Sequence, residues 1–326
     1  MSGPRHRRNR PRPCWRAWLL SSCLPLALAA CGSAEETAGD NGVQGVLLDA
    51  QMSEISGLAA SRRHPGVLWM HDDGGNPARL FATDASGGRI ATFTVEGVTK
   101  TDWEDMAAFV LDGRPYLLVA DTGDNGGLRR TLQLHVFEEP AVLENARLSP
   151  AWSIAFRWPD GPLDCEAVAV DADGGQILLV SKKRTPPELF SLPLRPQGDG
   201  LQVAAARGAL AGVPAPALDI PADAPRRRRY EHQVTAADLS PDGRRLAVMT
   251  YRDLMVYTRQ GAEDWSRAIA RPPAIAALPW LPQAEAMGWR ADGSALLATG
   301  EFIPAPLFRI RPPSPPAPAA GTPPTP

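Results

Sequence analysis

Short apolar runs of four or five residues recur along the chain, with turn-forming residues between them. Five of these runs directly follow a turn that contains glycine, at residues 67–70, 116–119, 177–180, 246–249 and 295–298. A shorter run with an aromatic residue comes after each of them, and a segment with an acidic residue beside small apolar ones comes before. Apolar runs separated by turn clusters at this spacing predict antiparallel β-strands, not strand–helix–strand units.

This unit occurs five times between residues 45 and 311, and the first four copies also show a fourth strand, for example at 89–93 and 202–205. Four antiparallel strands repeated along a chain are typical of the blades of a β-propeller. The fifth copy lacks a fourth strand, and the segment at 45–48 would complete it, closing the ring and covering the exposed strand edges. We therefore predict an all-β fold, a β-propeller of five four-stranded antiparallel blades closed by an N-terminal strand. A sixth, degenerate blade within residues 201–230 and an unrepeated β-sandwich are the alternatives.

The N-terminal end has the features of an export signal. Residues 1–16 are basic, and residues 18–30 are apolar but too short to span a bilayer as a helix, which takes about 20 residues. The junction Ala29-Ala30-Cys31-Gly32 resembles the lipobox of bacterial lipoproteins. That resemblance implies a lipid on Cys31 and, since Gly32 is not aspartate, an outer-membrane location facing the periplasm. An ordinary secretory signal cleaved after Ala30 is the alternative.

The chain therefore divides into four expected parts: a lipoprotein signal peptide (1–30), a tether (31–44), the β-propeller (45–311) and a Pro-rich disordered tail (312–326). Residues 1–30 hold six of the 34 basic residues and none of the 36 acidic ones, which leaves the mature chain with a formal charge of −8. A chain of this sign has no general attraction for nucleic acid. Cys14 and Cys23 would leave with the signal and Cys31 would carry lipid, so Cys165 alone would remain and no disulfide could form within the mature chain.

Blade topology brings the start of each inner strand and the end of the second strand to the same rim of the ring. The candidate catalytic groups are the acids at the strand starts, Glu54, Glu104 (or Asp105), Glu166, Asp238 and Glu285. The second-strand ends supply a ligand-binding rim of His71, Asp72, Asp73, Lys182, Lys183, Tyr251, Arg252 and Glu301. Carboxylates this close must be protonated, paired with a base, hydrogen-bonded or bound to a cation. In the alternative interpretation, the strand-start acids accept hydrogen bonds from the neighbouring blade and only hold the blades together.

A glycine-rich loop that carries Asp121, Asp124 and Asn125 is the candidate metal site, together with the loop at 71–76. Hard oxygen ligands on flexible loops suit Ca²⁺, which we expect as the cofactor. Neither loop has EF-hand spacing, and the alternative is that these side chains form Asx turns. The sequence shows no Gly-x-Ser-x-Gly motif of a serine nucleophile.

The segment Ser240-Pro241-Asp242-Gly243 resembles a turn of WD40-like and TolB-like propellers. The Glu-x-x-Gly-Leu segment at 54–58 and the Glu-Ala pairs at Glu166 and Glu285 resemble exported bacterial propellers, including the esterase-like and phytase-like ones. The runs of adjacent lysine, arginine and aspartate expected of a phytase site are missing. We expect a lipid-anchored envelope module that binds a protein, glycan or small molecule through an acidic top face, with Ca²⁺. A metal-assisted hydrolase of a phosphoester, ester or glycan at the same face is the alternative.

Overall fold

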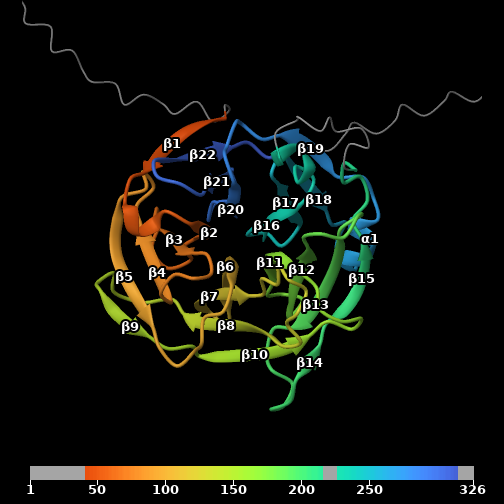
Figure 1. Cartoon of the computed structure of the whole chain (residues 1–326), viewed down its shortest axis with the longest axis horizontal. Coiled ribbons are helices and arrows are strands. Elements are labelled where there is room, and N and C mark those ends of the chain that lie inside the picture. The colour runs from red at the N-terminus through yellow and green to blue at the C-terminus, as the bar shows by residue number, and fades with distance from the viewer. Residues whose placement is uncertain (1–40, 216–225, 315–326) are drawn as a thin grey trace, which may run out of the picture. The chain divides into compact units, whose positions relative to one another are not determined.

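The computed structural model describes residues 41–215 and 226–314, which belong to one compact unit, Gly39–Pro326. The strands form five sheets arranged around a common centre (Figure 1). The first sheet contains β2 (Ile55–Ala60), β3 (Leu68–Asp72), β4 (Arg79–Thr83), β5 (Arg89–Val95) and β9 (Ala146–Leu148). The second contains β6 (Trp103–Leu111), β7 (Arg114–Asp121), β8 (Leu132–Glu138), β10 (Trp152–Arg157) and β14 (Gln202–Val203).

The other three sheets have four strands each. The third contains β11 (Cys165–Asp171), β12 (Gln176–Ser181), β13 (Glu188–Pro193) and β15 (Ala205–Ala209). The fourth contains β16 (Val234–Leu239), β17 (Arg245–Thr250), β18 (Asp253–Thr258) and β19 (Ala274–Ala277), and the short helix α1 (Trp265–Ile269) links its last two strands. The fifth contains β20 (Ala284–Trp289), β21 (Leu296–Gly300), β22 (Ala305–Ile310) and β1 (Gly42–Leu47). Two 3₁₀ turns, η1 (Ala50–Met52) and η2 (Arg226–Arg229), complete the elements of the described part.

The predicted five-bladed propeller is confirmed. The inner strands β2, β6, β11, β16 and β20 contact one another in that order, and β20 contacts β2, so the ring is closed. Strand β1 pairs antiparallel with β22, and Figure 1 shows the first strand of the chain lying beside the last. The N-terminal strand therefore completes the fifth blade, as the missing fourth strand of that unit predicted.

One predicted strand is wrong. The segment expected at 202–205 is not the fourth strand of the third blade, because β14 pairs in parallel with β10 of the preceding blade. The fourth strand is β15, which pairs antiparallel with β13. Strand β9 adds to the first sheet in the same parallel way, through β5. Outside residues 216–225, which are not described, the insertion at 201–230 contains no sixth blade.

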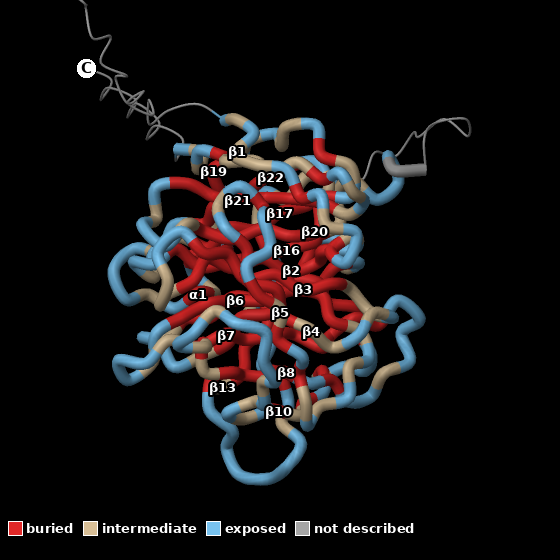
Figure 2. The backbone as a smooth tube through the Cα atoms, turned by 90° about the vertical axis from the view of Figure 1, so that its left-hand side faces the viewer, coloured by how far each residue is buried: buried red, intermediate tan, exposed pale blue. Residues whose placement is uncertain are grey.

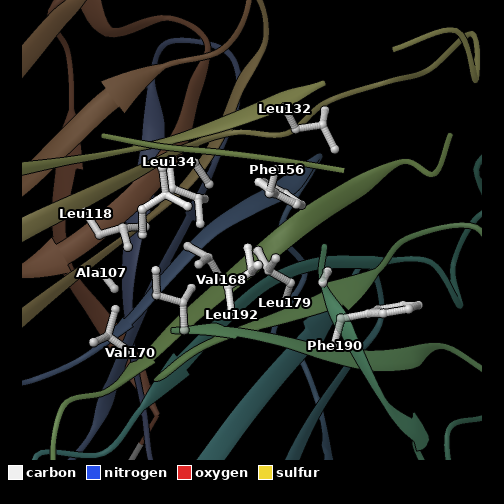
Figure 3. Packing of buried hydrophobic residues seen from close by; sticks show 14 of the residues in the cluster. Ala107, Leu118, Leu132, Leu134, Phe156, Val168, Val170, Leu179, Phe190 and Leu192 are labelled. Carbon is white, nitrogen blue, oxygen red and sulfur yellow. The ribbon is translucent and has the colours of Figure 1, made fainter. Parts of the chain in front are cut away.

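The hydrophobic core consists of five clusters, and each lies between two neighbouring blades. Figure 3 shows one of them, in which Leu118 of the second blade packs toward Val168 and Leu179 of the third. Both faces of a blade are therefore covered: Leu117 belongs to one cluster and the adjacent Leu118 to the next. The inner strands are buried along nearly their whole length, and exposed residues gather in the peripheral loops (Figure 2).

The predicted signal peptide lies outside the described residues, as do Cys31 and most of the tether and of the Pro-rich tail. Within the described ranges, we find no helix with the length and apolar character needed to cross a membrane. Cys165 is a free, fully buried thiol at the start of β11, as its place in an apolar strand predicted.

Candidate functional site

The inner strands share a polar position that the fold directs toward the centre of the ring. In every sheet, the register between the inner strand and its neighbour shifts around the second residue of the inner strand. Such a β-bulge re-aims the side chain it contains. The five residues at this position are Ser56, Glu104, Glu166, Thr235 and Glu285. The residue two positions earlier is also polar in every blade: Glu54, Asp102, Asp164, Gln233 and Gln283.

We call the end of the ring at which the inner strands begin the mouth, and the surrounding loops the top face. At the mouth, oxygen atoms of Asp73, Asp102 and Glu104 lie within 4.8 Å of one another, and so do those of Glu104, Asp164 and Glu166. Glu104 belongs to both groups. The loops after the second strands contribute to the same place, because a Cβ on Gly123 would lie 2.0 Å from Oε1 of Glu104. The mouth therefore gathers carboxylates from three neighbouring blades.

Lys182 lies among these acids as a buried cation. Its Nζ forms an ion pair with Glu166 and sits 5.7 Å from the centre of the Tyr251 ring. The Tyr251 hydroxyl donates a hydrogen bond to Oε1 of Glu285 at 2.6 Å. Burial lowers the pKa of Lys182, but Glu166 and Glu285 outweigh it and raise the pKa above its ordinary value, so the ammonium stays charged.

Burial raises the pKa of most carboxyls at the mouth. The pKa of Glu104 lies well above its ordinary value because of burial and then of the nearby Glu166. Burial, reinforced by Asp73, raises the pKa of Asp102 to about 6. Burial also raises the pKa of Glu285 to about 7, although Lys182 and the Tyr251 hydroxyl act in the opposite direction. These carboxyls therefore hold protons at higher pH than ordinary ones, because burial and their mutual repulsion disfavour the charged form.

Two of the predicted catalytic acids are not among the buried carboxyls of the mouth, although Glu54 borders it: its carbonyl accepts a hydrogen bond from the N–H of Asp73 at 2.8 Å. Glu54 is exposed and precedes β2, where Asn76 donates a hydrogen bond to its carboxylate at 2.6 Å. Asp238 is the fifth residue of β16, not a strand-start residue, and accepts hydrogen bonds from the backbone N–H groups of Leu239 and Trp289. Trp289 belongs to the neighbouring blade, so Asp238 joins two blades, as the structural interpretation of these acids expected.

Asp105, the alternative to Glu104, also holds the ring together. It is fully buried, and its carboxylate accepts hydrogen bonds from the backbone N–H groups of Met106, Val168 and Ala237. These donors come from three different blades. Glu104 lies on the β-bulge next to Asp105, and its side chain faces the mouth.

The predicted rim residues separate into two sets. Asp73, Lys182, Lys183, Tyr251 and Glu301 lie at or around the mouth: Lys183 pairs with Asp164 at 2.7 Å, and Gln283 donates to Glu301 at 2.9 Å. The others face different surroundings. His71 is buried against Trp103, and burial, then Lys100, lowers its pKa to about 4. Burial raises the pKa of Asp72 to about 6. Arg252 pairs with its neighbour Asp253 at 2.9 Å.

The side-chain oxygens of the predicted metal loop accept hydrogen bonds from other groups of the protein. Asp121 accepts hydrogen bonds from the backbone of Thr101 and Asp102 and pairs with Arg129 at 2.6 Å. The carboxylate of Asp124 accepts hydrogen bonds from the backbone N–H groups of residues 128 and 129, and the Asn125 amide oxygen accepts one from Lys183. These contacts hold the loop in place, but they join residues four or more positions apart and are therefore not the Asx turns of the alternative, which bond the N–H two residues on.

Asp102 and Asp164 were absent from the sequence-based candidates, although both belong to the groups at the mouth. A signal for them exists in the sequence, since Asp102-Trp103-Glu104 and Asp164-Cys165-Glu166 repeat the same Asp-x-Glu spacing. Alternation along a strand directs residues i and i+2 to one side, so the pair acts together.

Large apolar side chains surround the mouth. On the top face, Leu128, Trp280 and Phe302 are 81%, 75% and 61% exposed. Phe302 has a φ of +73°, a backbone conformation that is a rare outlier for a bulky residue and is often found at ligand-binding positions. Its N–H donates to the carbonyl of Ser53 at 2.8 Å, so the neighbouring blade holds it there.

No family model matches the chain, and no curated protein matches its sequence. Among solved structures, the chain is similar to one described as the structure of U3-55K, with 11% identity and a TM-score of 0.38 over 79% of this chain and 67% of that chain. It is also similar to the crystal structure of RRP9 WD40 repeats, with 11% identity and a TM-score of 0.39 over 80% of this chain and 67% of that chain.

Proposed function

We propose that this protein is a binding module of the cell envelope that holds a protein partner on its top face, and that the partner presents a basic segment to the mouth. The observation that carries this proposal is the charge imbalance at the mouth. Six carboxyls gather there, on Asp73, Asp102, Glu104, Asp164, Glu166 and Glu285, while Lys182 and Lys183 supply two ion pairs. Electrostatic complementarity of this kind selects a positively charged partner and speeds its association.

The apolar side chains of the top face favour a protein over a glycan or a small molecule. Leu128 lies on the loop after β7, whereas Trp280 and Phe302 lie on loops on either side of β20 and β21. A partner that covers all three spans the mouth. Exposed tryptophan and phenylalanine are the residue types that anchor protein interfaces, and their rings also attract lysine and arginine.

We infer the location of the module from the predicted N-terminal signal. Under this proposal, lipid on Cys31 anchors the chain to the outer membrane on its periplasmic side, and residues 31–44 separate the anchor from the propeller. The top face can then meet proteins of the envelope while the chain stays at the membrane.

The proposal is tested with the full chain in detergent and two fluorescent peptides, one of alternating lysine and leucine and one of alternating glutamate and leucine. We expect anisotropy to show binding of the lysine peptide alone, with an affinity that falls as salt rises. The double variant Glu301→Gln, Phe302→Ala should weaken binding at least tenfold. Val142→Ala, at an exposed site away from the top face, should leave it within twofold. Equal binding of both peptides, or no effect of the double variant, would refute the proposal.

Metal-assisted hydrolysis is a second candidate, and Glu285 is the observation in its favour. A carboxyl with a pKa of about 7, beside a tyrosine hydroxyl and a lysine, is suited to general acid–base catalysis near neutral pH. A screen of phosphoester, ester and glycoside substrates with the wild-type chain and Glu285→Gln tests it. Turnover that Glu285→Gln abolishes would support hydrolysis, and no turnover of any substrate would exclude these substrate classes.

A further inference from the structure

The starts of β6 and β11 bring two identical polar patterns together. Asp102 and Glu104 come from one strand start, and Asp164 and Glu166 from the next. Glu104 has a carboxylate oxygen within 4.8 Å of those of Asp164 and Glu166, and one within 4.8 Å of those of Asp73 and Asp102. The two patterns therefore form one continuous set of oxygen ligands, with Glu104 in its middle.

Glu104 provides a second, independent observation. Its side chain is only 4% exposed, yet it makes no hydrogen bond or ion pair with any other residue in the described ranges. Oε2 of Glu166 is buried in the same place and, among the described residues, has no hydrogen-bond partner either. A buried carboxylate without a partner is costly, since burial removes its water and nothing replaces it.

The backbone around Glu104 is shaped to leave room for these oxygens. A Cβ on Gly123 would lie 2.0 Å from Oε1 of Glu104 and 2.4 Å from Oδ2 of Asp102, and one on Gly74 would lie 2.1 Å from Oδ1 of Asp102. Any side chain at either glycine would force the carboxylates out of place. Both glycines lie on loops that follow second strands, so two loops form walls around the oxygen cluster.

The nearby lysines pair with only part of this set. Lys100 approaches Asp73 through the backbone, with its Nζ 2.7 Å from the carbonyl oxygen, and does not pair with the carboxylate. Lys182 pairs with Glu166 and Lys183 with Asp164, whereas Asp73, Asp102 and Glu104 have no ion pair with a described basic residue. The groups contain neither histidine nor cysteine within the described part of the chain. Oxygen-only ligands in an irregular arrangement suit Ca²⁺, which takes six to eight oxygens and tolerates uneven geometry. Zn²⁺, which prefers nitrogen and sulfur, does not fit.

We propose that the mouth binds Ca²⁺ through Glu104, which shares one group of oxygen ligands with Asp73 and Asp102 and another with Asp164 and Glu166. This site differs from the loop that the sequence indicated, where the oxygens of Asp121 and Asp124 accept backbone hydrogen bonds. It goes beyond the proposed partner binding, because Ca²⁺ needs no partner to occupy the site. Bound Ca²⁺ would neutralise carboxylates that the partner's basic segment is proposed to contact, so the peptide experiment above is run without Ca²⁺. Glu301, Phe302 and Trp280 lie outside the site and remain available to a partner.

The test uses Ca²⁺ and Tb³⁺ alone as probes on the full chain in detergent. Calorimetry with Ca²⁺ measures affinity, and Tb³⁺ luminescence excited through tryptophan reports proximity, because Trp103 lies between Asp102 and Glu104 in the chain. We expect Ca²⁺ to bind, to raise the melting temperature and to displace Tb³⁺. Glu104→Gln, which keeps the size of the side chain but removes its charge, should weaken Ca²⁺ at least tenfold. The exposed Glu54→Gln should change it less than twofold.

Glu104→Gln should remain folded, since it relieves repulsion at the mouth, and circular dichroism without metal checks this. Asp102→Asn is a second variant with the same expected loss of Ca²⁺ affinity. Absence of Ca²⁺ binding at millimolar concentration, or equal affinity in wild type and Glu104→Gln, would overturn the inference. Loss of affinity in Asp124→Asn alone would assign the ion to the predicted loop and would overturn it as well. Failure of the lysine peptide to bind would leave the Ca²⁺ site standing, so the two proposals can fail separately.

Discussion

Oδ2 of Asp105 accepts a hydrogen bond at 3.1 Å from the backbone N–H of Ala237, a residue 132 positions further along the chain. The same oxygen accepts a second hydrogen bond from Val168 at 2.8 Å. One carboxylate therefore joins three inner strands, β6, β11 and β16, of which β6 and β16 belong to blades that are not adjacent in the ring. The centre of the propeller is held by polar contacts as well as by the apolar clusters between blades.

Replacement of Asp105 by alanine should destabilise the fold strongly. Three buried N–H groups, on Met106, Val168 and Ala237, would lose their acceptor, and each unsatisfied buried donor costs about 1–3 kcal/mol. We expect the free energy of unfolding to fall by about 3 kcal/mol or more in urea titrations. Glu138→Ala, which removes surface ion pairs with Arg114 and Arg63, should cost less than about 1 kcal/mol. Equal losses in the two variants would contradict the role given to Asp105.

The closing strand β1 offers a matched pair of adjacent residues. Leu47 is fully buried between the fifth and first blades, whereas Val46 is 40% exposed. Leu47→Ala should lower the free energy of unfolding by about 2–5 kcal/mol because it leaves a cavity where the ring closes. Val46→Ala should cost less than about 1 kcal/mol, since little apolar area is lost. Chemical denaturation of both variants measures the difference, and a small effect of Leu47→Ala would mean that β1 contributes little to closure.

Asp238 should make stability depend on pH. Burial, with Arg62 acting in the opposite direction, raises its pKa from 3.8 to about 6 in the folded state. Between these pH values the folded protein holds a proton on Asp238 that the unfolded chain has lost, so the contribution of Asp238 to stability is greatest below about pH 4 and is lost as pH rises through 6. The contribution is on the order of 3 kcal/mol. Asp238→Asn should therefore lose less stability than wild type between pH 4 and pH 7.

The control for this effect is Asp112→Asn, in an exposed turn. Its free energy of unfolding should follow the wild-type pH dependence, because both chains keep Asp238 and every other buried carboxyl. Parallel curves for wild type and Asp238→Asn would show that the Asp238 carboxyl does not titrate in this range.

The proposed lipid anchor on Cys31 can be tested by cell fractionation. Cys31→Ala removes the thiol that would carry lipid, so we expect the chain to move from the membrane fraction to the soluble fraction after cell lysis. Cys165→Ala is the matched control, since that thiol is buried in β11 and cannot be lipidated in the folded protein. Membrane association of the Cys31→Ala variant would contradict the lipoprotein assignment.

The sequence alone predicted five blades and the way in which the ring closes, and the structure removed the alternative of a sixth blade in the described part of residues 201–230. Apolar runs such as Tyr116–Val119 can be recognised in the sequence, because a strand that packs on both faces must be apolar along its length. A turn must follow where the strand ends. Leu117 and Leu118 show the reason, since they face different neighbouring blades. The sequence also showed that the last unit lacks a fourth strand, and β1 supplies that strand.

Only the tertiary structure decided which acids face the mouth. Asp105 and Glu104 are adjacent in sequence. The carboxylate of Asp105 accepts hydrogen bonds from three blades, whereas the carboxylate of Glu104 accepts none from the described residues. The β-bulge at the start of β6 separates them, and the bulge depends on pairing with β7, which a residue pattern does not contain. For the same reason Asp238 was expected at the mouth and lies between blades. The pairing of a strand with its hydrogen-bonded neighbours decides which of its residues face the mouth. The pairing therefore also sets the direction of each carboxylate.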